Sequence, residues 1–212
     1  MAQYGKSVYW DERYTKDPEP FDWYQRYSGI KDILAQHVKK EDAILMVGAG
    51  NSRLSEEMYD DGFRNIENID ISKVVIEQME EKYKDRDMTW RMMNACSLEY
   101  ADEYFDVALD KGTLDSILCG EGSTANAAKM CSEASRVLKP NGVLLVISYG
   151  QPDNRLSYLE KEEYGWTVDV QTVPKPTVSA AAVPDAKDAS SVHYIYVCRK
   201  GGAGGTGEEA KA

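Results

Sequence analysis

The sequence is poor in the residues that hold metals or form nucleophilic dyads. It contains only two histidines, and its cysteines, Cys96, Cys119, Cys131 and Cys198, show no Cys-x-x-Cys spacing. Zinc sites and Cys–His nucleophiles depend on such pairs, so we expect neither a metal site nor a catalytic thiol. Cysteines without a framework spacing are typical of reduced thiols rather than of disulfides.

Positive charge and long apolar runs are also scarce. The chain has 25 Lys and Arg against 36 Asp and Glu, a formal net charge of -11, and no basic cluster stands out. This balance repels a phosphate backbone, so we expect no nucleic-acid partner, and a basic protein is the more natural substrate. No apolar run approaches the ~18–20 residues that span a bilayer, and residues 1–6 lack a signal-peptide core. We therefore expect no membrane partner and a cytoplasmic location.

What the sequence does contain is a glycine turn after a short apolar run. Residues 44–47 are followed by Gly48-Ala49-Gly50-Asn51-Ser52, a pattern typical of a buried strand that turns tightly into a helix capped by Ser52. Glycines let a ligand approach the backbone, and a helix N-terminus presents free N–H groups. Asp70 lies 20 residues beyond Gly50, at the end of the next apolar segment, where a carboxylate can accept hydrogen bonds from both ribose hydroxyls. The pattern predicts a cofactor that contains an adenine nucleoside.

The residues around this turn also narrow the choice of cofactor. A dinucleotide fingerprint has a third glycine three positions after the second, where this chain has Arg53. A Walker-type phosphate loop, with Gly-Lys-Ser or Gly-Lys-Thr at the strand–helix turn, is absent. S-adenosylmethionine carries no phosphate and needs only the open turn and the ribose contact. The residues therefore favour it over NAD or FAD.

Apolar runs and helical patterns alternate along the first 150 residues. Strands are expected at 44–47, 65–70, 88–93, 104–110 and 143–149, and helices at 28–40, 54–62, 73–84 and 124–138. Ser72 can cap the helix at 73–84, and the Pro-Asn-Gly sequence at 140–142 predicts a turn that ends the helix at 124–138. This alternation predicts an α/β fold with a doubly wound, mostly parallel, Rossmann-like sheet and helices on both faces. Such sheets bind ligands at the carboxyl ends of their strands, which is where Asp70, Asn94, Asp110 and Lys111 fall.

Beyond Gly150 the pattern changes to a helix at 153–163 and two strands at 166–173 and 192–198. A Pro/Ala-rich loop at 174–190 joins these strands, and no helical pattern separates them, so we expect an antiparallel pair that completes a seven-stranded sheet. We divide the chain into an aromatic N-terminal cap (1–30), the main domain (31–199) and a disordered, Gly-rich tail (200–212).

Aromatic residues concentrate in the cap. Trp10 and Tyr14 lie four positions apart and share one face of a helix, and Trp23 follows a break at Pro18 and Pro20. Such aromatics either pack onto the core or form a lid that covers a cofactor and excludes water. The spacing alone favours core packing.

Four motifs in the chain resemble those of one known family. They are Tyr9-Trp10-Asp11-Glu12-Arg13-Tyr14, Phe21-Asp22-Trp23, Val47-Gly48-Ala49-Gly50-Asn51-Ser52 and Leu109-Asp110-Lys111-Gly112-Thr113-Leu114-Asp115. Together with the seven strands they are similar to class I S-adenosylmethionine-dependent methyltransferases. Within that class they resemble the eukaryotic lysine methyltransferases of translation elongation factor 1-alpha, a group that includes the one whose gene neighbours and fuses with endothelin-converting enzyme 2. The similarity covers residues 4–150 well and the C-terminal strands loosely.

The resemblance implies a role for each candidate cofactor residue. It places the cap aromatics over the methionine end, as a lid, and Lys111 beside the sulfonium end. It also implies that Asp70 and Ile71 hold ribose and adenine, and that Asn94 and Ala95 flank the adenine edge. The full set is Trp10, Tyr14, Trp23, Gly48, Gly50, Asp70, Ile71, Asn94, Ala95 and Lys111. The chain departs from the family pattern at Met46 and Asn94, where acids are common. An Asn oxygen can still accept a hydrogen bond from the adenine amine, so we expect weaker binding rather than none.

The implied reaction is methyl transfer to a protein lysine, with elongation factor 1-alpha as the implied substrate and S-adenosylhomocysteine as the product. The nucleophile must lose a proton, and Asp110 or Asp115 could orient the incoming ammonium, although neither is assigned as a base. Two alternatives stay open, a small-molecule methyltransferase and a non-catalytic module that binds S-adenosylmethionine or a protein partner. NAD-dependent oxidoreduction is a more distant alternative because of Arg53.

Overall fold

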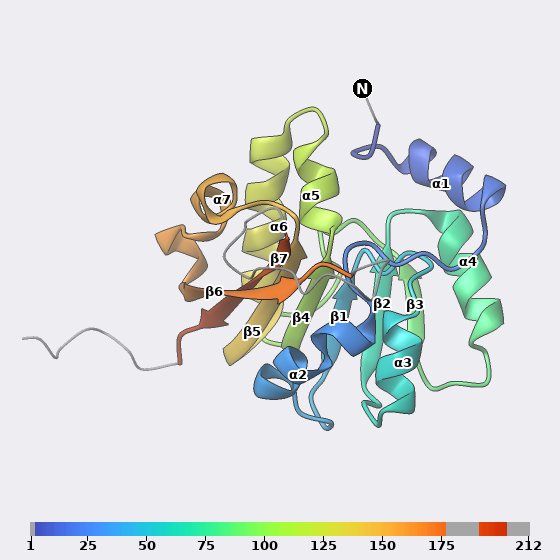
Figure 1. Ribbon diagram of the computed structural model, residues 1–212, viewed down its shortest axis with the longest axis horizontal. Helices are drawn as coiled ribbons and strands as arrows, with labels where there is room; N and C mark the ends of the chain where they lie inside the picture. Colours follow the sequence, from blue (N-terminus) through green and yellow to red (C-terminus); the bar gives the residue numbers. More distant parts are fainter. Residues whose placement is uncertain (1–2, 177–190, 203–212) are drawn as a thin grey trace, which may run out of the picture.

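The computed structural model of the chain describes residues 3–176 and 191–202. Their strands form a seven-stranded sheet in the order β3-β2-β1-β4-β5-β7-β6 (Figure 1). Strands β1 to β5 run parallel, and β7 runs antiparallel to both of its neighbours. The strands are β1 Ile44–Val47, β2 Ile66–Asp70, β3 Thr89–Met92, β4 Phe105–Lys111, β5 Leu138–Ser148, β6 Trp166–Pro174 and β7 Val192–Lys200. The predicted mostly parallel, Rossmann-like sheet is confirmed.

Helices cover both faces of this sheet because successive side chains of a strand point to opposite sides. Leu45 and Val47 pack with residues of α5, α6 and α7, whereas Ile44 and Met46 pack with residues of α2 and α3. The helices are α1 Ser7–Lys16, α2 Tyr27–His37, α3 Leu54–Asp60, α4 Lys73–Lys82, α5 Thr113–Leu118, α6 Ser123–Val137 and α7 Leu156–Leu159. As predicted from the sequence, Ser72 caps α4, since its hydroxyl accepts from the backbone N–H of Val75 at 3.3 Å.

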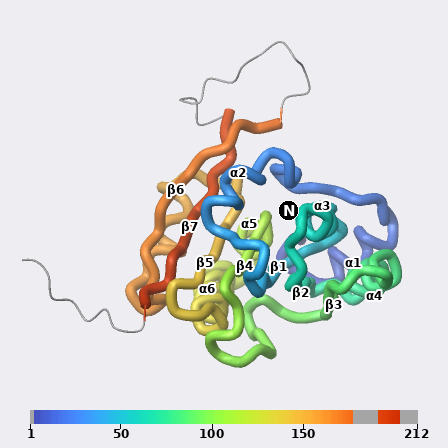
Figure 2. Tube along the Cα trace, turned by 90° about the horizontal axis from the view of Figure 1, so that it is seen from below, coloured from blue at the N-terminus to red at the C-terminus, as the bar shows by residue number. Residues whose placement is uncertain are grey.

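The cap lies at the carboxyl ends of the strands before it joins the main domain. Its helix α1 lies beside α4 in both views of the chain (Figures 1 and 2). Tyr14 of α1 packs in an apolar cluster with Val75, Ile76 and Met79 of α4. The proposed cap boundary at residue 30 falls inside α2. The cap is therefore continuous with the helix that packs under β1.

Strand β5 begins at Leu138 rather than at residue 143. Its pairing with β4 passes from Phe105↔Leu138 to Val107↔Val143, so residues 139–142 bulge out of the ladder. Asn141 takes a left-handed φ of 65° within this bulge. The Pro-Asn-Gly sequence, which predicts a turn, thus forms a bulge inside a strand.

The single helix predicted at 153–163 is wrong. The segment consists instead of 3-10 turns at Pro152–Asn154 and Glu162–Tyr164 on either side of the four-residue α7. Two contacts accompany this interruption of the helix. Arg155 forms a buried ion pair with Asp115, and the Trp166 indole N–H donates to the carbonyl of Leu159 at 2.8 Å. The short α5 that directly follows β4 was not predicted.

The C-terminal end differs from the prediction by a few residues. Lys200, assigned to a disordered tail, is the last residue of β7, and its ammonium donates to the carbonyls of Ser135 and Leu138 at 2.8 and 2.7 Å. Residues 203–212 of the predicted tail, and most of the predicted 174–190 loop, lie outside the described residues. Across the described ranges, no helix combines the length and apolar character needed to cross a membrane.

Candidate active site

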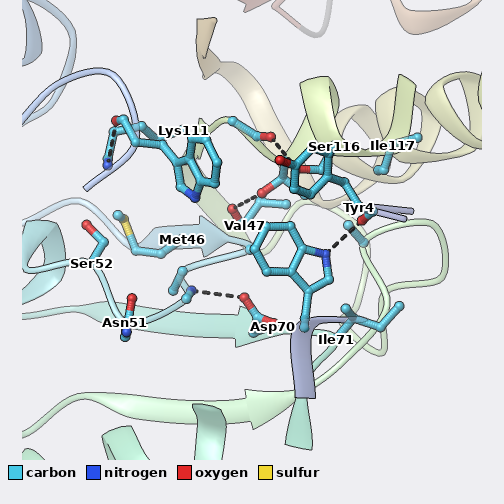
Figure 3. Close-up of a pocket in the computed structure, with 18 of the residues that line it drawn as sticks. Tyr4, Met46, Val47, Asn51, Ser52, Asp70, Ile71, Lys111, Ser116 and Ile117 are labelled. Carbon is cyan, nitrogen blue, oxygen red and sulfur yellow. Dashed lines mark hydrogen bonds between the residues drawn. The ribbon is translucent and has the colours of Figure 1, made fainter. Parts of the chain in front are cut away.

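A cavity opens at the carboxyl ends of β1, β2 and β4, beneath the N-terminal cap (Figure 3). Residues from all three strands line it, together with aromatic side chains of the cap. All ten candidate cofactor residues are among its walls: Trp10, Tyr14, Trp23, Gly48, Gly50, Asp70, Ile71, Asn94, Ala95 and Lys111. The structure thus gathers into one cavity residues that are spread over about a hundred positions of sequence.

The floor of the cavity is the glycine turn after β1. Gly48 and Gly50 both adopt left-handed backbone angles, with φ of 62° and 53°. A Cβ on Gly48 would lie 1.9 Å from the Thr113 hydroxyl, and a Cβ on Gly50 would lie 2.6 Å from the Tyr14 hydroxyl. Thr113 is held in place because its hydroxyl donates to the carbonyl of Val47 at 3.0 Å. Both glycines are therefore required by backbone angle and by close approach.

Ser52 does not cap the helix after this turn in the predicted way. Helix α3 starts at Leu54 without a side-chain cap, and the Ser52 hydroxyl accepts from the backbone N–H of Leu54 at 3.1 Å. The same hydroxyl donates to the carboxylate of Asp22 in the cap. Ser52 therefore links the turn to the cap as well as to α3.

Asp70 ends β2 with its carboxylate buried in the wall of the cavity. One oxygen accepts from the backbone N–H of Gly50 and the other from that of Ser72, each at 2.9 Å. Burial raises the pKa of Asp70 to about 6, although backbone N–H groups favour its charged form. Each carboxylate oxygen has more than one lone pair, so both can also accept a ribose hydroxyl. The bare glycine turn and this carboxylate together fit an adenosyl cofactor.

Aromatic side chains of the cap cover the cavity. The Trp10 and Tyr14 rings stack with centroids 5.8 Å apart, and the Trp10 indole donates to the carbonyl of Tyr4 at 2.7 Å. Arg13 lies over Phe21 and Trp23, at 5.3 and 5.9 Å from the ring centroids. Tyr14 belongs both to the apolar cluster between α1 and α4 and to the cavity wall. This one residue therefore packs onto the core and also lines the cavity.

Two polar residues that sequence reasoning left without a role, Asn51 and Asp22, fasten the cap over the cavity. The Asn51 amide donates to the carbonyl of Glu19 at 2.7 Å and accepts from the backbone N–H of Phe21 at 3.3 Å. Asp22 accepts from the Lys111 ammonium at 3.1 Å as well as from Ser52. We call Asn51, Ser52, Lys111 and Asp22 the cap latch. All four fall in the motifs quoted above, but sequence alone does not reveal that these motifs bind one another.

Lys111 reaches the cavity wall with its charge already neutralised. Its ammonium, buried with only 6% of the side chain exposed, pairs with Asp22 and also donates to the carbonyl of Trp23 at 3.0 Å. Burial lowers the pKa of Lys111, and the Asp22 carboxylate opposes that effect. A paired ammonium repels a cofactor sulfonium far less than a free one would.

Asp110 and Asp115 do not line the cavity. Asp110 is fully buried and accepts from the backbone N–H groups of Thr113 and Leu114 at 2.7 and 3.0 Å, which caps α5, and burial raises its pKa to about 7. Asp115 accepts from Ser148 at 2.6 Å and from Arg155 at 2.9 Å. Both carboxylates thus accept hydrogen bonds from groups within the protein, and a role for either in orienting the substrate stays a prediction.

The wall of the cavity that contains Ile71 and Asn94 is more open to solvent. Ile71 is 39% exposed, and Asn94 is exposed with its side-chain oxygen accepting from the backbone N–H of Cys96 at 2.9 Å. A carbonyl oxygen can accept a second hydrogen bond, so this contact leaves Asn94 able to bind an amine. No group of three or more metal-ligating side chains occurs in residues 3–176 or 191–202.

Comparison with known proteins agrees with the class that this fold and site define, the S-adenosylmethionine-dependent methyltransferases. The methyltransferase domain family matches residues 45–146. Among solved structures, a methyltransferase from Methanosarcina mazei aligns with a TM-score of 0.62 and 17% identity, over 86% of this chain and all of that chain. A methyltransferase from Burkholderia thailandensis with bound S-adenosylhomocysteine aligns with a TM-score of 0.57 and 15% identity, over 80% and 76% of the two chains. At these identities the likeness establishes the fold.

Closer relatives define the family. An eEF1A lysine and N-terminal methyltransferase from Xenopus laevis is 36% identical over 187 residues, which cover 84% of this chain and 26% of that protein. EEF1A lysine methyltransferase 4 of Mus musculus is 33% identical over 177 residues, which cover 78% of this chain and 69% of that protein. The chain spans about a quarter of the length of the first relative. It belongs to the family of these eEF1A lysine methyltransferases.

Proposed function

We propose that this protein methylates a lysine side chain of translation elongation factor 1-alpha in the cytoplasm. The observation that carries the proposal is the identity, one residue in three over most of the chain, with relatives named for that activity. The gathering of the ten candidate residues in one cavity under an aromatic cap supports the same function. A net charge of -11 also suits a basic protein substrate better than RNA.

Different residues of the cavity bind different parts of the cofactor in this proposal. In the proposal, Asp70 accepts both ribose hydroxyls, Gly48 and Gly50 leave room for the adenosyl group, and Asn94 binds the adenine amine. Trp10, Tyr14 and Trp23 cover the methionine end and exclude water. S-adenosylmethionine supplies an activated methyl carbon, so the protein mainly provides position and a dry site.

The substrate lysine must be neutral to attack, and its ordinary pKa is about 10.4. In the proposal, neither Asp110 nor Asp115 removes the proton, because both accept hydrogen bonds from groups within the protein. We therefore assign the protein the role of binding the amine and assign deprotonation to solvent water at the mouth of the site.

The experiment that tests the proposal is methyl transfer to purified elongation factor 1-alpha. We expect tritium from methyl-labelled S-adenosylmethionine to enter the factor, and mass spectrometry to locate the added methyl groups on lysine. The Asp70→Ala variant serves as the inactive control, and we expect it to transfer no label. Label on the N-terminal amine alone, or no label from a preparation that binds S-adenosylhomocysteine, would refute the proposed substrate.

A further inference from the structure

Three aromatic side chains outside the candidate cofactor set, Tyr24, Tyr149 and His193, meet beside the cofactor cavity. Tyr24 lies with its ring centroid 5.9 Å from that of Tyr149 and 5.1 Å from that of His193. Tyr149 directly follows β5, and His193 is the second residue of β7. Because Ser148 pairs with Tyr194, these two residues lie at the same carboxyl edge of the sheet as the cavity. Tyr149 is 53% exposed, so the group opens to solvent.

The backbone at Tyr24 is held in a conformation that tyrosine rarely adopts. Its φ is +63°, and the backbone N–H of Gln25 donates across it to the carbonyl of Trp23 at 2.7 Å, which forms a three-residue turn. The Lys111 ammonium donates to the same carbonyl and fixes the turn. A strained residue that persists in a tied-down segment points to a functional constraint on its side chain.

This turn brings the Tyr24 ring to the wall of the cofactor cavity. A Cβ on Gly112 would lie 3.2 Å from the ring. Gly112 and Trp23, the chain neighbour of Tyr24, both line the cavity. The aromatic group therefore adjoins the cavity on one side and solvent on the other.

The positive charge beside these rings is already paired with a carboxylate, so an incoming cation meets no unpaired positive charge there. Arg155 packs 5.2 Å over one face of Tyr149, but its guanidinium is paired with Asp115 at 2.9 Å. The Tyr24 hydroxyl stays protonated, because burial and the nearby Asp115 carboxylate both raise its pKa.

His193 is uncharged at neutral pH. Burial, followed by the charge of Lys175, lowers its pKa to about 4. The Gln25 amide donates to the carbonyl of Pro174 at 2.7 Å and to the Nδ1 atom of His193 at 3.1 Å, so Nδ1 accepts and the proton of the neutral ring lies on Nε2. An incoming ammonium therefore meets a neutral imidazole here.

From this geometry we infer that Tyr24, Tyr149 and His193 form the seat of the substrate amine, a role that rests on the proposed function. The alkyl chain of the substrate enters from the Tyr149 side, and its ammonium lies against the tyrosine rings, which attract cations through their π faces. The Tyr24 hydroxyl accepts a hydrogen bond from the amine at the boundary with the cofactor cavity. Tyr24 and Tyr149 thus select a primary amine on a flexible chain.

The test uses n-butylammonium as a probe for the lysine side chain, titrated into the S-adenosylhomocysteine-saturated protein and followed by NMR. We expect saturable shifts in the amides of Tyr24, Gln25, Tyr149 and His193, at millimolar probe. Tyr149→Ala should weaken this binding about tenfold. Tyr104→Ala is the matched control, since Tyr104 is 47% exposed but lies at the opposite, amino end of β4, and it should bind the probe like the unmodified protein.

A second variant separates the hydroxyl from the ring. Tyr24→Phe should lose affinity for n-butylammonium but keep its affinity for n-butyltrimethylammonium, which cannot donate a hydrogen bond. Shifts that map elsewhere, or that Tyr149→Ala and Tyr24→Phe leave unchanged, would overturn the inference.

Methylation assays keep this test distinct from the proposed function. If elongation factor 1-alpha is the substrate, Tyr149→Ala should raise its KM about tenfold and leave the KM for S-adenosylmethionine unchanged. Binding of the probe at these residues without methylation of the factor would refute only the proposed substrate. Methylation with an unchanged KM in Tyr149→Ala would refute only the amine seat.

Discussion

At the scale of single residues, the site depends on positions where no other side chain fits. Gly48 shows this most clearly, because its left-handed φ of 62° and the Thr113 side chain both exclude a Cβ. Gly165 offers a comparison, since it has a φ of 64° but no atom within 4 Å of the Cβ position. Both glycines therefore have a left-handed φ, but only Gly48 has atoms next to the position of a Cβ.

This pair yields a controlled prediction. Gly48→Ala should displace Thr113 or the turn and weaken S-adenosylhomocysteine binding at least tenfold, whereas Gly165→Ala should cost only the backbone strain of about 1 kcal/mol. Calorimetric titration and thermal unfolding of both variants measure the two effects. Equal losses of cofactor affinity in the two variants would show that the close contact with Thr113 is unimportant.

Asp70 gives the site a dependence on pH. Its pKa of about 6 means that the free protein holds a proton on this carboxylate below that pH, whereas ribose hydroxyls bind best to the ionised form. Affinity for S-adenosylhomocysteine should therefore be constant above about pH 7 and fall as pH drops, reaching about a tenth of its plateau at pH 5. Asp70→Asn should bind weakly with no such slope. A flat profile in the unmodified protein from pH 5 to 7 would contradict this assignment.

At the scale of elements, the cap is fastened to the main domain by the latch rather than by α1 alone. Asn51 and Ser52 come from the glycine turn, Lys111 comes from the end of β4, and each binds residues 18–23 of the cap. The cofactor turn and the cap are therefore coupled. Opening the cap requires these hydrogen bonds to break.

Loosening the latch should speed the escape of the cofactor. In Asn51→Ala we expect faster amide exchange in residues 17–24 of the cofactor-free protein, and S-adenosylhomocysteine should dissociate about five- to tenfold faster. The control is Asn65→Ala, which removes one amide-to-carbonyl bond, to Glu41 at 3.0 Å, at the other end of β2. Unchanged amide exchange in residues 17–24 of Asn51→Ala would show that Asn51 does not hold the cap closed.

Sequence patterns predicted elements well where periodicity is strong. The five parallel strands, the antiparallel C-terminal pair and the capping of α4 by Ser72 follow from local patterns that tertiary contacts reinforce. The predicted helix at 153–163 failed because Arg155 and Trp166 make long-range or non-local contacts that a helical period does not encode. The latch and the aromatic seat were beyond prediction for the same reason: each joins segments far apart in the chain.

Among the candidate site residues, those at strand ends could be placed from topology. Asp70, Asn94 and Lys111 line the cavity because the carboxyl ends of parallel strands share one edge. Asp110 also ends a strand, but its side chain turns inward to cap α5, whose formation the sequence did not reveal. Strand position therefore predicts the edge at which a residue lies, and the following element decides where its side chain points.

At the scale of the whole molecule, the acidic charge bears on how a protein substrate is met. A net charge of -11 attracts a basic partner over distances comparable to the Debye length, which is about 8 Å at physiological ionic strength. This attraction affects the rate at which a protein partner associates and not the binding of the cofactor in its cavity. Salt should therefore affect the binding of a protein substrate more than the binding of the cofactor.

Salt provides the measurement. If elongation factor 1-alpha is the substrate, as proposed, raising NaCl from 50 to 300 mM should increase its KM severalfold and change the KM for S-adenosylmethionine less than twofold. Steady-state kinetics at fixed pH gives both values. A KM for the protein substrate that is insensitive to salt would show that recognition does not depend on the overall charge.

We propose that the cavity at the carboxyl ends of the strands holds S-adenosylmethionine through Asp70. Calorimetric titration of the protein and of Asp70→Ala with S-adenosylmethionine, S-adenosylhomocysteine and NAD tests it most directly, with circular dichroism to confirm that the variant is folded. We expect micromolar binding of both adenosyl ligands, no binding of NAD, and a loss of about 100-fold or more in Asp70→Ala, the effect of removing two charge-assisted hydrogen bonds. A folded Asp70→Ala that binds both adenosyl ligands as tightly as the unmodified protein would show that Asp70 does not hold the cofactor.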